Sequence, residues 1–144
     1  MSYVTTEQLE DRYGTRALID LTDRDSPATG AIDADTVARA IADADAMIDG
    51  YLATRYSLPV AEVPPILVPL AGAIVFYQLH TYSPDDKTKA DYEQALKTLA
   101  KISDGMIKLP LATAGEEAAQ TDAGGVRVND RDRPFTEDTM KGLI

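Results

Sequence analysis

The stretch "ILVPLAGAIVFYQL", residues 66–79, is the longest apolar run in this 144-residue sequence. Proline fits an α-helix only in the first turn, so we place Pro69 there and begin a helix at the Pro64–Pro65 pair. The helix is expected to continue to about Tyr82. Because nearly every position along it is apolar, it should be buried on most of its faces. It is therefore the expected centre of the core.

The segment before it, "DTVARAIADADAMIDGYLATRYSLP" (residues 35–59), has the apolar period of a helix. Its apolar residues recur at intervals of four, three, four and four, and form one stripe: Val37, Ile41, Ala44, Ile48 and Leu52. Asp35 is the predicted N-cap. Pro59 cannot continue a helix and disfavours helical backbone at the preceding residue. We therefore expect the helix to end near Arg55 or Tyr56, where the chain turns a corner.

The segment after it, residues 83–111, predicts a further helix, expected to be the longest of the chain. Its apolar stripe consists of Tyr92, Leu96, Leu99, Ile102 and Met106. At the other end of the chain, Thr5 and Gln8 have the spacing of a capping box. They predict a short helix over Thr6–Tyr13 with Gly14 as its stop, then a short helix or turn over 15–23 and a loop over 24–33. The pattern predicts an all-α fold for residues 1–110: a small helical bundle around a buried central helix.

The composition changes after Pro110. Residues 111–125 are small, polar and glycine-containing, which predicts a flexible linker. Residues 126–144 follow with extended, then helical, character and are expected to be an extended C-terminal arm that docks on another chain. The reason is that this segment ends in apolar side chains that would otherwise stay in water. Its expected partner-binding residues are Arg131, Arg133, Phe135, Met140, Leu143 and Ile144.

The charge and the residue inventory exclude several classes of function. The formal charge of −10 disfavours sequence-specific DNA binding, because an acidic surface repels phosphates, but it suits a surface past which DNA slides. There is no cysteine, which rules out disulfides and thiolate chemistry. The N-terminus lacks the pattern of a signal peptide, and the longest apolar run is too short for a bilayer. We expect a soluble protein of a reducing cytoplasm, with no membrane contact.

Catalytic and metal sites also have little support. Asp43, Asp45 and Asp49 are candidate metal ligands, but a solvated or intersubunit face is the better interpretation, because a hard cation needs ligands from several elements. His80 is expected to be structural, at the end of the apolar helix. We therefore predict no enzyme activity, no metal and no cofactor; a metal-dependent hydrolase using Asp45 and Asp49 is the distant alternative.

The corner after the 35–59 segment carries the remaining candidates. Arg55 and Tyr56 belong to residue types that often anchor protein interfaces, so we take both as candidate partner-binding residues. The competing interpretation is that Tyr51 and Tyr56 only pack the corner.

Several segments together resemble the phage Mu-like head–tail connector family, formerly a domain of unknown function. The most specific are the corner "D-x-Y-L-x-x-R-Y-x-L-P", which spans residues 49–59, and the "RPFT" block at residues 133–136. The N-terminal "YVTTEQLEDRYGTRALIDLTDRD" and the "VPPILVPLAGAIVFYQLH" stretch occur in the expected order, so the resemblance covers nearly the whole chain.

The resemblance implies a structural virion protein in the neck of a tailed phage or phage-like particle, assembled in the cytoplasm of the bacterial host. Such adaptors form a homo-oligomeric ring below the portal protein, expected here in twelve copies to match the portal. They offer the tail terminator or stopper protein a surface, and DNA passes through the ring without specific binding. A tail-completion or terminator protein, or a cytoplasmic helical binding module, remains the alternative. Infectious phage, prophage and gene-transfer particle are all open.

Overall fold

The computed structural model describes residues 1–115, and these form five α-helices. They are α1 (Thr6–Tyr13), α2 (Thr15–Thr22), α3 (Ala34–Leu52), α4 (Leu67–Leu79) and α5 (Asp86–Ser103). Within this part of the chain, the one β-type pairing is an isolated antiparallel bridge between Tyr56 and Thr113. The predicted all-α fold is confirmed.

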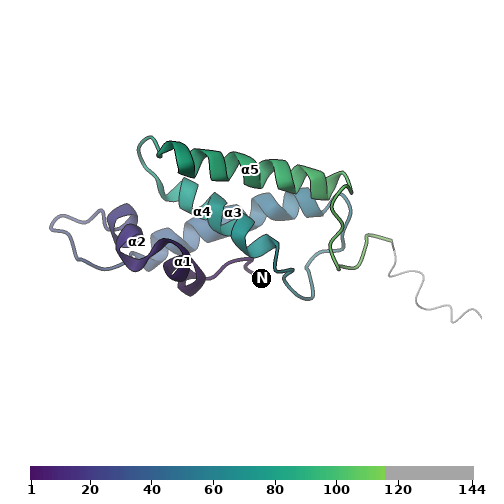
Figure 1. The fold of residues 1–144 in the computed structure, drawn as a ribbon. Helices are drawn as coiled ribbons and strands as arrows, with labels where there is room; N and C mark the ends of the chain where they lie inside the picture. Colours follow the sequence, from purple (N-terminus) through teal and green to yellow (C-terminus); the bar gives the residue numbers. More distant parts are fainter. Residues whose placement is uncertain (116–144) are drawn as a thin grey trace, which may run out of the picture.

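Helix α4 packs against both α3 and α5, which also contact each other, while α1 and α2 pack together at one end of the bundle (Figure 1). No residue of α4 is fully exposed, and six are buried: Leu67, Ala71, Gly72, Ile74, Val75 and Leu79. Burying each large aliphatic side chain stabilises the fold by about 1.5–3 kcal/mol. Helix α4 therefore contributes much of the apolar packing that holds its neighbours together. The prediction of a buried central helix is confirmed.

The helix starts agree with the sequence in one case and differ in another. Thr5 and Gln8 form the predicted capping box, in which each side chain binds the other residue's backbone N–H. The N-cap of α3 is Asp33, not Asp35, because the Asp33 carboxylate accepts hydrogen bonds from the backbone N–H groups of Asp35 and Thr36. Asp35 lies in the first turn of the helix instead.

The helix ends come earlier than predicted. Helix α3 ends at Leu52, whose carbonyl then accepts hydrogen bonds from the N–H groups of Arg55 and Tyr56 in a tight turn. Helix α4 begins at Leu67, with Pro69 in its first turn as expected, but it ends at Leu79, and Tyr82 is 89% exposed. Helix α5 has 18 residues against 19 for α3, so it is not the longest.

Met106 does not belong to the buried stripe of α5, because the helix stops at Ser103 and the Met106 side chain is 76% exposed. The chain reverses at Gly105, which has a positive φ of 79°. The next apolar residue to be buried is Leu109.

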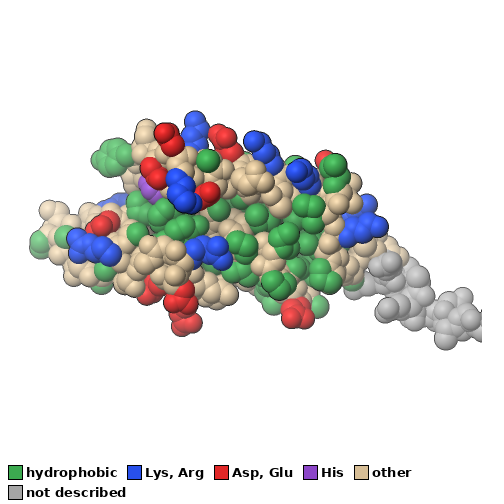
Figure 2. All heavy atoms as spheres, in the orientation of Figure 1, with side chains coloured by type: hydrophobic (Ala, Val, Ile, Leu, Met, Phe, Trp, Pro, Cys, Tyr) green, Lys and Arg blue, Asp and Glu red, His purple; other side chains and the backbone are tan. Residues whose placement is uncertain are grey.

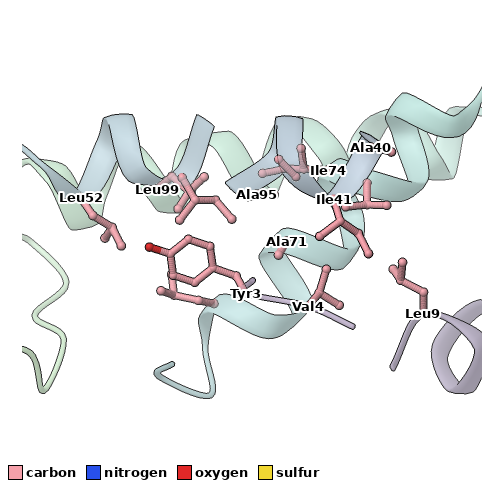
Figure 3. Close-up of a cluster of buried hydrophobic side chains, with 14 of the residues drawn as sticks. Tyr3, Val4, Leu9, Ala40, Ile41, Leu52, Ala71, Ile74, Ala95 and Leu99 are labelled. Atoms are coloured by element: carbon pink, nitrogen blue, oxygen red, sulfur yellow. The ribbon is translucent and has the colours of Figure 1, made fainter. Parts of the chain in front are cut away.

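The core also includes residues that precede the first helix. Tyr3 and Val4 are almost fully buried in the same cluster as Ala71 of α4 and Leu99 of α5 (Figure 3). The N-terminal segment therefore closes one side of the three-helix packing rather than trailing from it.

Candidate functional site

The acidic residues of α3 hold the N-terminal segment. The backbone N–H of Tyr3 donates to Asp45 Oδ1 at 3.0 Å, and the Tyr3 hydroxyl donates to Asp49 Oδ1. Burial and the Asp49 carboxylate raise the pKa of the Tyr3 hydroxyl well above its ordinary value. Asp45 and Asp49 are thus half-buried and bind within the chain, whereas Asp43 is exposed as a solvated face requires.

His80 has a structural position at the end of α4. Its Nδ1 lies 2.7 Å from the carbonyl oxygen of Phe76, and its ring meets the Phe76 ring edge-on. In residues 1–115 no cluster of three or more histidine, aspartate or glutamate side chains has an arrangement that could hold a metal ion.

The corner after α3 pairs with the last residues of the described chain. The N–H of Ser57 donates to the Ala112 carbonyl and the N–H of Ala114 donates to the Arg55 carbonyl, both at 3.0 Å. Leu111 packs against the core. Residues 111–114, expected to begin a flexible linker, are thus held on the corner by backbone pairing.

Tyr56 lies inside this corner. Its side chain is 3% exposed, and its hydroxyl accepts a hydrogen bond from the N–H of Leu109 at 2.9 Å. A partner-binding role for the Tyr56 side chain does not fit this position, because a partner cannot reach the ring. The competing interpretation, in which Tyr56 packs the corner, describes what the structure shows.

Arg55 remains at the surface of the corner, half-buried. Its guanidinium covers Gly105 so closely that a Cβ added there would lie 2.1 Å from an Arg55 nitrogen. The residue thus packs on the turn that follows α5. The other six candidate residues, from Arg131 to Ile144, lie outside the described residues.

A concave feature lies between α1, α4 and α5, where sequence reasoning placed no site. It consists of three adjoining depressions, all of which include Arg12, and we call it the Arg12 groove. The depression that reaches His80 has a volume of about 490 Å³. The apolar part of the lining comes mainly from α4: Val68, Pro69, Leu70, Ala73 and Phe76. Hydrophobic side chains gather on this face, with charged groups around them (Figure 2).

Aromatic stacking fixes the wall of the groove. The rings of Tyr13 and Phe76 stack with centroids 4.0 Å apart and planes 5° from parallel. This contact attaches the end of α1 to α4, beside His80. Burial raises the pKa of the Tyr13 hydroxyl, against an opposing effect of Arg12.

Charged groups surround the apolar lining unevenly. Asp85 lines only the depression that reaches His80. Asp91 lines that depression and the one that reaches Gln94, and Asp11 lines the one that reaches Gln8, whereas Arg12 lines all three. Asp91 pairs with Lys87 at 2.5 Å, and both side chains are largely exposed. Arg12 forms no ion pair with any described residue and packs its stem over Gly72.

The apolar excess of α4 was the one sequence signal for this groove. A helix that is apolar on every side needs neighbours on every side, and α1, α3 and α5 cover it incompletely. What the sequence could not show is which flank stays open, because this depends on where α1 packs.

Comparison with known proteins identifies the family. Residues 3–128 match the family model described as Bacteriophage Mu, Gp36. The chain belongs to the phage Mu Gp36 family. The resemblance noted from the sequence is thereby confirmed, and the protein is of phage origin.

Two relatives match this Gp36 family member from end to end. "Gene product J" of Escherichia phage Mu is 31% identical over 144 residues, which is all of both chains. "Mu-like prophage FluMu protein gp36" of Haemophilus influenzae (strain ATCC 51907 / DSM 11121 / KW20 / Rd) is 30% identical over 142 residues, 99% of this chain and 98% of the relative. Among the described helices, none combines the length and apolarity that crossing a membrane requires.

Proposed function

We propose that this Gp36 family member is a structural head–tail connector, without enzymatic activity, that forms a ring between the portal and the tail. The observation that carries the proposal is the resemblance of the sequence to the head–tail connector family, supported by a match to gene product J of phage Mu that covers the C-terminal segment as well as the helical domain. The fold supports it, because a small all-α unit with one open flank suits packing against repeated copies. The described residues also offer no cluster of metal-ligating side chains for hydrolytic chemistry.

In this proposal, each protomer contributes its helical domain to a ring, expected in twelve copies, below the portal protein. Residues 126–144 dock on the portal or on a neighbouring subunit, and the tail terminator or stopper binds the opposite side. The charge of −10 favours a channel surface on which DNA does not stick. The location is the neck of the virion, reached after assembly in the host cytoplasm.

The test is a complementation assay with particles that lack this protein. If it is a connector, purified protein binds to filled heads and restores their joining to separately purified tails, and electron microscopy shows a ring at the portal vertex. Binding to isolated tails but not to heads would support the alternative of a tail-completion or terminator protein. Binding to neither would contradict both virion roles.

A further inference from the structure

We infer that the Arg12 groove of one copy binds residues 131–144 of a second copy of this chain. The inference rests on the proposed ring, since it names the surface of a neighbouring subunit to which the C-terminal segment binds. The apolar lining of the groove is the first argument. Leu70, Ala73 and Phe76 are only half-buried, and an apolar segment laid over them removes their remaining surface from water. The C-terminal segment supplies Phe135, Met140, Leu143 and Ile144 for this contact.

Opposite charges are the second argument. Asp85 and Asp91 line the groove beside Ala73 and Phe76, and Arg12, which also has Asp11 beside it, forms no ion pair with a described residue. The C-terminal segment offers opposite charges on the two sides of Phe135: Arg131 and Arg133 before it, Glu137 and Asp138 after it. Lys87 does not block the acidic end, because its exposed pair with Asp91 is a weak surface interaction that exchanges readily.

The position of the chain exit argues for a second copy rather than the same one. The described chain leaves the bundle at the end away from α1 and α2, so the His80 end of its own groove lies across the bundle (Figure 1). Helix α5 alone, which borders the groove, is about 27 Å long. A chain of the length of residues 116–130 has a root-mean-square span of about 20 Å. A neighbouring copy beside the exit brings a groove within that span.

Cysteine cross-linking in the full chain tests the contact directly, because the natural sequence contains no cysteine. One preparation carries Gln94→Cys, at an exposed position that lines the groove. A second carries Thr139→Cys, between the apolar anchors. Lys89→Cys is the matched control, since it is also exposed on α5 but about 140° around the helix from Gln94.

After mixing and mild oxidation, the Gln94→Cys and Thr139→Cys chains should form a disulfide-linked heterodimer about tenfold faster than the Lys89→Cys and Thr139→Cys chains, because docking raises the local thiol concentration. Equal rates for the two pairs would overturn the inference. So would a chain carrying both Gln94→Cys and Thr139→Cys that closes only within itself, since the segment would then occupy its own groove.

A charge exchange tests the pairing. Arg12→Glu in the Gln94→Cys chain should slow cross-linking, because it places a carboxylate against Glu137 and Asp138. Glu137→Lys and Asp138→Lys in the Thr139→Cys chain should restore the rate with Arg12→Glu and not with the natural arginine. Failure of this rescue would contradict the pairing of Arg12 with Glu137 and Asp138, and with it the direction in which the segment lies in the groove.

Binding of the cysteine variants to heads, measured beside their cross-linking, separates this inference from the proposed function. Rings that assemble and bind the portal without the Gln94–Thr139 cross-link would contradict the groove assignment and leave the connector role standing. Specific cross-linking together with no binding to heads would support the groove contact and contradict the connector role.

Discussion

Tyr3 shows how a single residue near the N-terminus stabilises this fold. Its ring is buried in the core, its backbone N–H binds Asp45 and its hydroxyl binds Asp49. Two carboxylates, spaced four residues apart on α3, are thus occupied by one residue. This explains how two acidic side chains lie beside the core with their carboxylates hydrogen-bonded.

Tyr3→Phe should destabilise the protein by about 1–2 kcal/mol, because it removes a hydrogen bond to a charged acceptor while the aromatic packing stays. For a domain of this size, the melting temperature should fall by about 3–6 °C. Tyr82→Phe is the control, since Tyr82 is 89% exposed and its loss of hydroxyl should leave the melt unchanged. Thermal unfolding followed by circular dichroism measures both. An equal effect of the two variants would contradict the assigned role of Tyr3.

The same residue predicts a pH dependence. Burial, followed by Asp49, raises the pKa of the folded-state Tyr3 hydroxyl above its ordinary value of 10.0. The folded state therefore holds this proton more tightly than the unfolded state does. The resulting stabilisation is complete below about pH 10 and is lost as the pH rises above it. Melts of the natural protein should fall more steeply between about pH 10 and pH 12 than those of Tyr3→Phe. Parallel curves would show that Tyr3 does not titrate as the structure implies.

At the scale of the helix, Asp33 and Asp35 are the two candidates for the N-cap of α3. The structure assigns it to Asp33, whose carboxylate accepts two backbone N–H groups and the Thr36 hydroxyl. Asp33→Ala should lower the melting temperature, whereas Asp35→Ala should change it little. The Thr36 hydrogen bonds hold the pKa of Asp33 below its ordinary value, so its contribution is present at neutral pH and is lost as the pH falls below about 4. The two melts should therefore converge in acid.

Helix α4 determines whether the domain has a core at all. Val75 is fully buried, and Val75→Asp places a charge without a partner among aliphatic side chains. The variant should lose several kcal/mol of stability, or fold only where the new carboxyl is protonated. Ala90→Asp, at an exposed position of α5, is the control. A Val75→Asp protein that melts like the natural one would show that α4 is not the central helix.

At the scale of the whole molecule, the helical domain and the C-terminal segment should be separable in function. The described domain closes on itself through the pairing of residues 55–57 with residues 112–114. Deleting residues 131–144 should therefore leave its circular dichroism spectrum and melt largely unchanged. The same deletion should yield heads without tails, because the segment supplies the apolar anchors for docking. A truncated protein that still enters particles and supports tail attachment would contradict the docking role.

The sequence by itself determined the elements of this protein. The apolar run of α4 and the stripe of α3 predict the helices, because a buried face must recur with the helical period whatever the neighbours are. The capping box at Thr5 is equally local, since its partners are three residues apart. The segments that carry the family resemblance could likewise be read without any knowledge of packing. The first residue of α3 could not be predicted in this way, because Asp33 and Asp35 carry the same side chain and the backbone conformation decides which of them is the N-cap.

Only the tertiary structure decided which residues meet across long separations. Tyr3 and Asp49 are 46 positions apart, and Tyr56 and Leu109 are 53 apart, so no periodicity relates them. Because of these contacts, the candidate metal ligands Asp45 and Asp49 instead bind the N-terminal segment. Tyr56, a candidate interface residue, is part of the core. The Arg12 groove arose in the same way, since an apolar helix predicts that its faces will be covered but not by what. The physical reason is that periodicity tells which face of an element is buried, whereas the partner of that face depends on how all the elements pack together.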